Sequence, residues 1–419
     1  MKLTDYPRYV RFWAASTVSG FGTYITTIAI NVIVVLRLGG DGVDVGFVNA
    51  ARWLPYPLLG LLAGVWIDRH RRKPILVAGD FGRGMIIVSI SVLGLTHTLT
   101  VPLLEVHMLV FGVLSLVSDA AYQSFVPQLV PRELLVRANA RLEQSASVAQ
   151  TTGPALAGWV TQLLSAPAAL LIDAISYFVS GFVVASIPSS SAPLPAAAPG
   201  NVGRQIREGL RWVYRHPRLG PLTWTTHLWF LSNSMFSVVF TVYALRERDM
   251  GPGGLGVVLA FAGAGAVLGT VITTRVGDRL GAGRTIILGR LVYAPAFAII
   301  IAAGATSPDA WTGFAGIAFG QLLIGFGLGL EGPQEMGYQQ AVTPDRLMGR
   351  MSATKRSINR GMIVIGAPLG GFVAGAVGNR PAMAIAAAGM VLVVVLLAAS
   401  DARHARMADQ LTEDEASAV

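Results

Sequence analysis

The sequence is poor in charge and has no cysteine. Of its 419 residues, 13% are charged and 53% are hydrophobic, whereas an ordinary soluble domain carries about 25% charged residues. The absence of cysteine excludes disulfide bonds and thiolate metal sites. The sequence also lacks Gly-x-x-x-x-Gly-Lys-Ser/Thr, His-Glu-x-x-His and Gly-x-Ser-x-Gly patterns, which mark nucleotide and hydrolase sites. We therefore predict that the protein is not an enzyme and has no cofactor and no bound metal.

The hydrophobic residues of the sequence are gathered in long apolar blocks. A block of about 18 or more apolar residues is typical of a membrane span. The blocks are continuously apolar rather than alternating, which indicates helices instead of barrel strands. Twelve blocks are present, at residues 10–36, 43–67, 74–96, 101–126, 144–165, 167–187, 221–245, 255–275, 285–304, 311–335, 357–378 and 381–400. We predict an all-α membrane protein with twelve transmembrane helices.

The distribution of Lys and Arg predicts the orientation in the membrane. If the N-terminus is cytoplasmic, 26 of the 32 Lys and Arg residues fall in cytoplasmic segments and four fall in outer loops. Cytoplasmic loops are expected to be rich in these residues. We therefore expect a multi-pass protein with both termini in the cytoplasm. This topology also accounts for the net charge of +9 without a nucleic-acid partner. The first block is too long for the apolar core of a cleaved signal peptide.

A polar connection separates the first six blocks from the last six. It begins with the Ser/Pro/Ala linker SSSAPLPAAAPG, for which no regular structure is expected. Basic residues then recur every three or four positions, at Arg204, Arg207, Arg211, Arg215 and Arg218. This spacing predicts a basic amphipathic helix at 201–218 that contacts the anionic inner leaflet or is simply solvated. The predicted divisions are an N-terminal bundle (1–188), a linker (189–220), a C-terminal bundle (221–400) and a cytoplasmic tail (401–419).

The two halves resemble each other. Asp68 recurs as Asp278, 210 residues later, and Asp119 recurs as Glu331, 212 residues later. The chain is therefore predicted to be a duplication that forms two pseudo-symmetric six-helix bundles. Parallel repeats of this kind place a binding site between the halves, near the middle of the membrane.

The stretch GVWIDRHRRK, residues 64–73, resembles the signature loop of the major facilitator superfamily, usually Gly-x-x-x-Asp-Arg-x-Gly-Arg-Arg/Lys. FVPQLVPRELLVRANA and LLIDAISYFVSG are similar to a bacterial branch that includes enterobactin exporters and macrolide efflux proteins. The resemblance implies the major facilitator fold, the bacterial inner membrane and efflux of a small amphipathic molecule such as a drug, siderophore or secondary metabolite. Because no P-loop is present, we expect coupling to protons, and we expect a monomer.

Two other functions remain open. An uptake permease of the same fold would accumulate its substrate in energised cells, where an exporter would deplete it. A non-transporting membrane sensor would show no substrate-induced proton flux. Export is favoured by a helix-five motif, since a Gly-Pro pattern there marks antiporters in this superfamily and proline bends a span. The matching residues are Gly153, Pro154 and Gly158.

The signature loop is expected to act as a cytoplasmic gate. In the superfamily this loop ties the two halves together at the cytoplasmic side, and carboxylate–Arg pairs suit such a latch. Acidic residues add little to membrane orientation, so Asp68 needs another reason to be there. The predicted gate residues are Asp68, Arg69, Arg72, Lys73 and Asp119, with Asp278, Arg279 and Glu331 as the second copy.

Charged and titratable residues inside apolar blocks are costly and are functional candidates. The candidates for proton coupling are Arg52, Glu105, His107 and Asp173. A surface position for Glu105 and a structural pairing for Asp173 are the alternatives. Asp80 and Arg83 are spaced to pair on one helix face, and we predict that this pair supports the signature loop.

Helices one, four, seven and ten line the substrate cavity in the superfamily. The substrate candidates on them are Tyr24, Thr27, Asn31, Ser115, His227, Trp229, Asn233, Phe236 and Gln321. An apolar pocket with a few polar groups suits an amphipathic ligand, although interhelical hydrogen bonds are the alternative for each residue. The glycines at 325, 327 and 329 resemble a nucleotide-binding fingerprint, but their place in a span predicts close helix packing.

Overall fold

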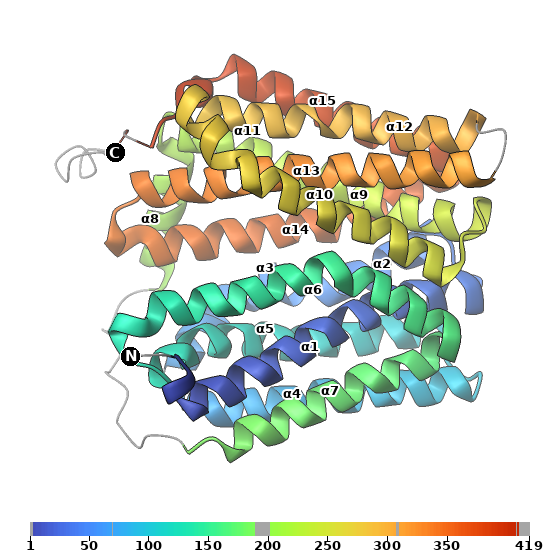
Figure 1. The fold of residues 1–419 in the computed structure, drawn as a ribbon, viewed down its shortest axis with the longest axis horizontal. Coiled ribbons are helices and arrows are strands. Elements are labelled where there is room, and N and C mark those ends of the chain that lie inside the picture. Colours follow the sequence, from blue (N-terminus) through green and yellow to red (C-terminus); the bar gives the residue numbers. More distant parts are fainter. Residues whose placement is uncertain (1–2, 69, 189–201, 307–309, 408, 410–419) are drawn as a thin grey trace. The chain divides into compact units, whose positions relative to one another are not determined.

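The computed structural model describes residues 3–68, 70–188, 202–306, 310–407 and 409, and in this part of the chain all regular structure is helical (Figure 1). The predicted linker at 189–200 and most of the predicted tail lie outside the described residues. Contacts divide the chain into two compact units. Unit 1 comprises Met1–Ala198 and Ala244–Ala260, and unit 2 comprises Pro199–Tyr243 and Phe261–Val419.

Unit 1 is built around α1, which packs against α6 and α7, and α4, which packs against α5 and α7. A π-helical turn, Ile33–Arg37, extends α1. The helices are α1 (Pro7–Val32), α2 (Gly42–Trp53), α3 (Pro55–Asp68), α4 (Arg72–Leu95), α5 (Val101–Phe125), α6 (Leu135–Leu164) and α7 (Ala166–Ser186).

Unit 2 is built around α9, which packs against α14 and α15, and α13, which packs against α11 and α12. Its helices are α8 (Val202–Arg215), α9 (Leu219–Val242), α11 (Ala282–Leu291), α12 (Tyr293–Thr306), α13 (Ala310–Val342), α14 (Asp345–Val377) and α15 (Asn379–Ala399). Helix α10 (Gly251–Leu280) begins in unit 1 and continues in unit 2.

The predicted all-α membrane fold is confirmed. Not every one of the twelve predicted spans, however, is a single helix that is long and apolar enough to cross a membrane. Ten helical segments among the described residues are long and apolar enough to cross a membrane. The block at 43–67 divides at Leu54 into α2 and α3, of 12 and 14 residues, because Pro55 begins a new helix. The block at 144–165 lies in α6, whose apolar residues are interrupted by glutamines and threonines.

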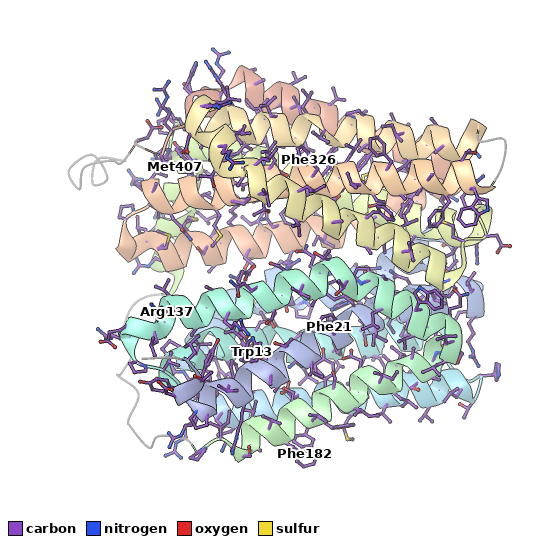
Figure 2. All side chains as sticks on the ribbon, viewed as in Figure 1. Trp13, Phe21, Arg137, Phe182, Phe326 and Met407 are labelled. Atoms are coloured by element: carbon purple, nitrogen blue, oxygen red, sulfur yellow. The ribbon has the colours of Figure 1, made fainter. Side chains whose placement is uncertain are left out.

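Large apolar side chains cover much of the outer surface. Trp159, Phe182 and Trp311 expose 57%, 65% and 81% of their surface. Figure 2 shows Phe182 pointing away from α7. Exposed apolar surface on this scale is unusual for a soluble protein and is what a lipid-facing surface requires.

The basic amphipathic helix is present as α8, and one of its faces is covered by protein. Trp212 and Val213 are buried, and the Trp212 indole N–H donates to Thr343 Oγ1 over 3.3 Å. Glu208 forms an ion pair with Arg350 of α14. The apolar face of α8 is therefore occupied partly by α14, while Leu210 is exposed.

The opposite face of α8 carries an exposed row of arginines at 207, 211 and 215. The side chains of Arg204 and Ile206 lie outside the described residues. After α8, the Nδ1 atom of His216 accepts the backbone N–H of Leu219 over 3.0 Å at the start of α9. Burial lowers the pKa of His216, which keeps the ring neutral and able to accept this bond.

Candidate functional site

Asp173 of α7 is a buried carboxylate surrounded by hydroxyl groups. The side chain is fully buried. Its Oδ2 accepts a hydrogen bond from Thr26 Oγ1 of α1, and its Oδ1 accepts one from Ser176 Oγ over 2.9 Å. Among the described residues, every hydrogen-bond partner of this carboxylate is therefore neutral.

Small and basic residues complete the surroundings of Asp173. Gly22 of α1 faces it so closely that an added Cβ atom would collide with the carboxylate. Arg52 does not reach Asp173; its Nη1 donates to Thr27 Oγ1 over 3.1 Å, and its guanidinium lies 5.3 Å from the Trp53 ring centre. Arg83 is paired with Asp80, so neither arginine makes a hydrogen bond to Asp173 in the described part of the chain.

The other two candidates for proton coupling, His107 and Glu105, are less deeply buried than Asp173. His107 donates from Nδ1 to the Leu103 carbonyl over 2.7 Å, and its Nε2 lies 2.9 Å from Ser89 Oγ of α4. This is an ordinary bond between helices. Glu105 is only partly buried. Of the three titratable candidates, Asp173 is the one whose ionised form is most costly to maintain.

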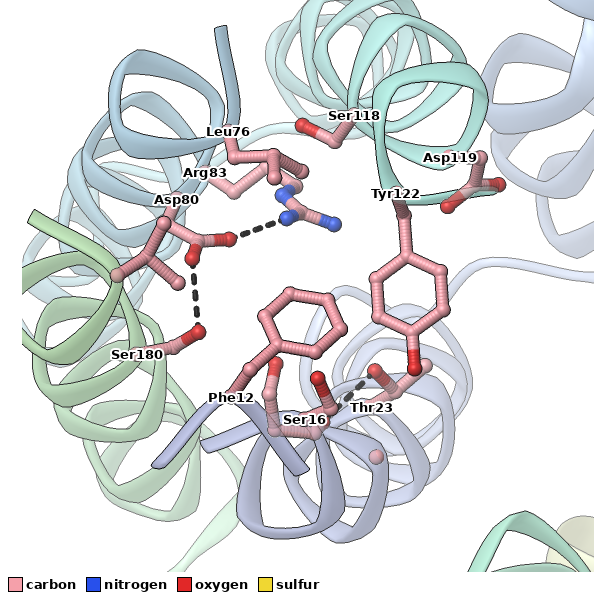
Figure 3. A pocket seen from close by; sticks show the side chains of 13 residues that line it. Phe12, Ser16, Thr23, Leu76, Asp80, Arg83, Ser118, Asp119, Tyr122 and Ser180 are labelled. Atoms are coloured by element: carbon pink, nitrogen blue, oxygen red, sulfur yellow. Dashed lines mark hydrogen bonds and ion pairs between the residues drawn. The ribbon is translucent and has the colours of Figure 1, made fainter. Parts of the chain in front are cut away.

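A polar cavity of about 230 Å³ lies within unit 1, at the end where α1 and α4 begin and α5 and α7 end. The predicted Asp80–Arg83 pair is confirmed and forms part of its wall. Figure 3 shows the Arg83 guanidinium pointing into this space, with Asp80 and Ser180 on one side and Tyr122 on the other. Ser180 Oγ donates to Asp80 Oδ2 over 2.8 Å, so this carboxylate is shared by a cation and a hydroxyl.

The predicted gate residues of unit 1 are placed in part. The side chain of Asp68 and the whole of Arg69 lie outside the described residues. Lys73 Nζ donates to the Ile187 carbonyl over 2.7 Å, which joins α4 to the end of α7. Asp119 is exposed and accepts from Tyr56 Oη over 2.7 Å. It also lines the cavity.

The signature loop can form without the glycine of the superfamily pattern. Arg71 stands at that position and caps α4, with a φ of −70° and a ψ of 124°. Any L-residue adopts these angles, and glycine is needed only where φ is positive. The substitution therefore causes no backbone strain.

Unit 2 contains a buried charge network centred on Arg290 of α11. The side chain is 1% exposed. Its Nε donates to Glu331 Oε2 over 2.7 Å, and its Nη2 donates to Glu335 Oε2 over 2.9 Å. The hydroxyls of Thr225 and Thr226 on α9 accept from its two terminal nitrogens, each over 2.7 Å. One guanidinium thus joins three helices.

Lys355 of α14 extends the network to a fourth helix. Its Nζ forms an ion pair with Glu335 Oε1, which also accepts from Gln339 Nε2 over 2.9 Å. Tyr293 Oη donates to Glu331 Oε1 over 2.9 Å. Two acids are thus balanced by two cations, and each of the four carboxylate oxygens accepts at least one hydrogen bond. Such a network is satisfied, but it leaves an uncompensated charge if one member is removed.

The sequence assigned these cations to the wrong environment. Arg290 and Lys355 are two of the 26 basic residues that the predicted topology places in cytoplasmic segments, yet both side chains lie inside unit 2. The repeat itself carries the missed signal. Arg290 lies 210 residues after Asp80, and Tyr293 lies 210 residues after Arg83. The second repeat therefore has a charged cluster at the same place in the sequence as the first. The acid Asp80 corresponds there to the cation Arg290, and the cation Arg83 corresponds to Tyr293.

The three residues predicted as the second copy of the gate, Asp278, Arg279 and Glu331, do not lie together in the structure. Asp278 and Arg279 are exposed near the end of α10. Glu331 instead lies in the buried network with Arg290. Close backbone contact between α11 and α13 makes this possible, because a Cβ atom added at Gly289 would meet Gly327 and Glu331.

The substrate candidates are spread over both units. In unit 1, Thr27 contacts Arg52, and Asn31 Oδ1 accepts from Asn49 Nδ2 over 3.4 Å. Tyr24 and Ser115 of the same unit are half-buried, as is Asn233 of unit 2. In unit 2, buried Gln321 and three aromatic or heteroaromatic residues, His227, Trp229 and Phe236, line the helix interfaces.

His227 adjoins the charge network. Its Nδ1 lies 2.6 Å from Asn359 Oδ1 of α14, and its Nε2 lies 2.7 Å from Tyr214 Oη of α8. Both partners can be satisfied by a neutral ring that donates from Nδ1 and accepts at Nε2. The ring therefore links α8 to the bundle interior without adding charge.

The glycine motifs bring helices together. A Cβ atom at Gly158 of α6 would meet Pro252 and Gly256 of α10, and one at Gly153 would meet the Tyr24 ring. Gly325 and Gly329 of α13 face the backbone of α10 in the same way. The close packing predicted for the 325–329 glycines is thus confirmed.

Comparison with known proteins agrees with this architecture. The profile of the transmembrane secretion effector family matches residues 6–418. The uncharacterised MFS-type transporter y4rN of Sinorhizobium fredii is 25% identical over 79% of each chain. Macrolide efflux protein A of Streptococcus pyogenes is 22% identical over 48% of this chain and 50% of its own length.

A solved structure shares the fold. It is that of a bacterial homologue of the iron transporter ferroportin in an inward-facing state, with a TM-score of 0.74 and 16% identity over 95% of this chain and 99% of that one. At this identity the likeness concerns the fold alone. The family match nevertheless covers nearly the whole chain. The chain therefore belongs to the transmembrane secretion effector family of the major facilitator superfamily and is a multi-pass membrane transporter.

Proposed function

We propose that the protein is a secondary transporter that exports a small amphipathic molecule in exchange for protons. The observation that carries this proposal is Asp173, a fully buried carboxylate held by hydroxyl groups within an apolar helix. Burying an ionised carboxylate without a cationic partner is unfavourable, so gain of a proton is the natural response. A group of this kind changes charge during a transport cycle.

The network in unit 2 is better suited to holding helices together. Glu331 and Glu335 are matched by Arg290 and Lys355, and neutralising any member would leave a partner unpaired. The paired acids of this network are stabilised in their ionised form, whereas Asp173, which has no ion-pair partner in the described part of the chain, can gain and lose a proton. We therefore assign proton carriage to Asp173 and a structural role to the network. The gate at Asp68, Arg69, Arg72 and Asp119 remains part of the proposal.

Export is favoured over uptake by two observations. The relative in Streptococcus pyogenes is named as a macrolide efflux protein, and Gly158 of the helix-five motif packs closely against Gly256 of α10. A macrolide or a molecule of similar amphipathic character is the proposed class of substrate. Its apolar body suits the aromatic residues Trp229 and Phe236, which lie on the predicted cavity helix α9.

A metabolite and susceptibility screen tests this function. A strain without the protein should retain at least one amphipathic compound that the complemented strain expels. Export of that compound should collapse when an uncoupler is added while cellular ATP is held constant. Persistent export under these conditions would rule out proton coupling, and accumulation by the complemented strain would favour the uptake permease.

The exposed arginines of α8 are proposed to contact anionic lipid. We expect replacement of arginines 204, 207, 211 and 215 by glutamine to remove the extra thermal stability that phosphatidylglycerol gives over phosphatidylcholine. Each arginine near such a surface contributes about 1 kcal/mol. The stability of purified protein in nanodiscs of the two lipids measures this effect. An unchanged difference between the lipids would show that this face is merely solvated.

A further inference from the structure

The polar cavity of unit 1 has no assigned role, and it approaches Asp173. Its wall includes Ser16, Thr23 and Ser180 as well as the Asp80–Arg83 pair (Figure 3). A polar cavity of about 230 Å³ has room for several water molecules. It is bounded on one side by Asp119, which is exposed, so solvent reaches the wall there.

Two helices carry hydroxyl groups from the cavity to Asp173. On α1, Thr23 lines the cavity, and Thr26, three residues further on, donates to Asp173. On α7, Ser180 lines the cavity, and Ser176, four residues before it, donates to Asp173. Residues three or four apart lie on the same helix face, about 4.5–6 Å apart along the axis. The carboxylate is therefore one helical turn beyond the cavity on both helices.

The charges around this path leave Asp173 as its titrating end. Asp80 is paired with Arg83 and bonded to Ser180. In the described part of the chain neither Arg83 nor Arg52 makes a hydrogen bond to Asp173; Arg83 pairs with Asp80, and Arg52 donates to Thr27. Asp119 lines the cavity at its exposed side.

We propose that this cavity is the route by which Asp173 exchanges its proton with solvent at the end of unit 1 that the charge distribution predicts to be cytoplasmic. The inference rests on the proposed function, because it gives a route to the proton that this function requires. On release, the O–H bond of the Asp173 carboxylic acid breaks and its electron pair stays on the carboxylate. The hydroxyl oxygen of Thr26 or Ser176 takes this proton as that hydroxyl gives up its own proton toward Thr23 or Ser180 at the cavity wall. Water in the cavity receives the released proton there and passes it toward Asp119 and the solvent.

Gly20 provides a way to block the cavity without disturbing Asp173. This residue lines the cavity, and a Cβ atom added there meets nothing within 4 Å. Gly20→Leu therefore fills the space with an apolar side chain. Gly375→Leu is the matched control, since its added Cβ atom also meets nothing within 4 Å and it lies on α14 in unit 2.

The measurement follows the carboxyl infrared band of Asp173 after a pH jump, in reconstituted full-length protein. The band is assigned by its loss in Asp173→Asn. Gly20→Leu should reach the same final protonation as the unmodified protein but about tenfold more slowly or worse, a change in barrier of about 1.4 kcal/mol or more. Gly375→Leu should leave the rate unchanged.

An unchanged rate in Gly20→Leu would overturn the route while leaving proton carriage by Asp173 intact. Absence of a titrating Asp173 band in the unmodified protein at every pH would overturn both. If Gly20→Leu fails to fold, Thr23→Val supplies the test, because it keeps the side-chain volume and removes one hydroxyl group. A rate in Thr23→Val equal to that of the unmodified protein would contradict the route.

Discussion

Asp173→Asn should abolish transport driven by a pH gradient while preserving exchange of substrate across the membrane. Asparagine is almost the same size as aspartate. Its amide oxygen can accept from one of the two hydroxyls, Thr26 or Ser176, and its amide N–H can donate to the other, so the helix interface should persist. It cannot bind or release a proton in the cycle. Gradient-driven transport should therefore fall about 100-fold or more, the lower range of what a positioned proton-transfer group contributes.

The measurement uses inverted membrane vesicles and the compound identified by the screen. Exchange of labelled for unlabelled compound reports binding and the conformational change, and uptake under an imposed pH gradient reports coupling. Glu105→Gln is the matched control, because it neutralises a half-buried carboxylate in the same unit. Loss of coupling in Glu105→Gln with normal coupling in Asp173→Asn would reassign the proton to Glu105.

Arg290→Leu should destabilise the protein severely. After the substitution, Lys355 is the one cation left in the network to balance the carboxylates of Glu331 and Glu335. Removing one partner of a buried ion pair costs about 3–5 kcal/mol because the other charge stays buried. Unfolding of the purified protein in detergent, followed by heating and size-exclusion chromatography, measures the loss.

A double substitution separates charge imbalance from lost packing. Arg290→Leu with Glu331→Leu removes one cation and one acid together and leaves the Glu335–Lys355 pair, so most of the stability should return. Arg350→Leu is the control at a more exposed pair with Glu208, for which about 0–1 kcal/mol is expected. A double variant no more stable than Arg290→Leu would contradict the charge-balance explanation.

The sequence predicts the fold well because the membrane limits the choices. An apolar run must form a helix when lipid offers the backbone no partner, so the predicted blocks are helical over nearly all of their length, although Val292 divides the block at 285–304 between α11 and α12. The block at 43–67 is less regular than expected, since Pro55 divides it. Asp173 was also identifiable, because one acid in an otherwise apolar block requires an explanation.

The unit 2 network was hidden because its members come from four separate helices. Arg290 and Lys355 lie near other basic residues along the chain, so they resembled topology signals. The helices are longer than the apolar blocks: α13 continues to Val342 and α14 begins at Asp345. Lys355, which flanks the block at 357–378, is therefore inside the bundle, whereas Arg290, Glu331 and Glu335 already lie within the blocks at 285–304 and 311–335. Only tertiary packing brings Arg290 to Glu331 and Glu335.

Substrate-triggered proton release tests proton carriage by Asp173 most directly. Purified protein in weakly buffered solution is mixed with the compound identified by the screen, and the pH of the solution is recorded with an indicator dye. An exporter that exchanges its substrate for a proton at Asp173 should release protons on binding, and Asp173→Asn should bind the compound without release. Equal proton release by the two proteins would contradict the assignment of the proton to Asp173.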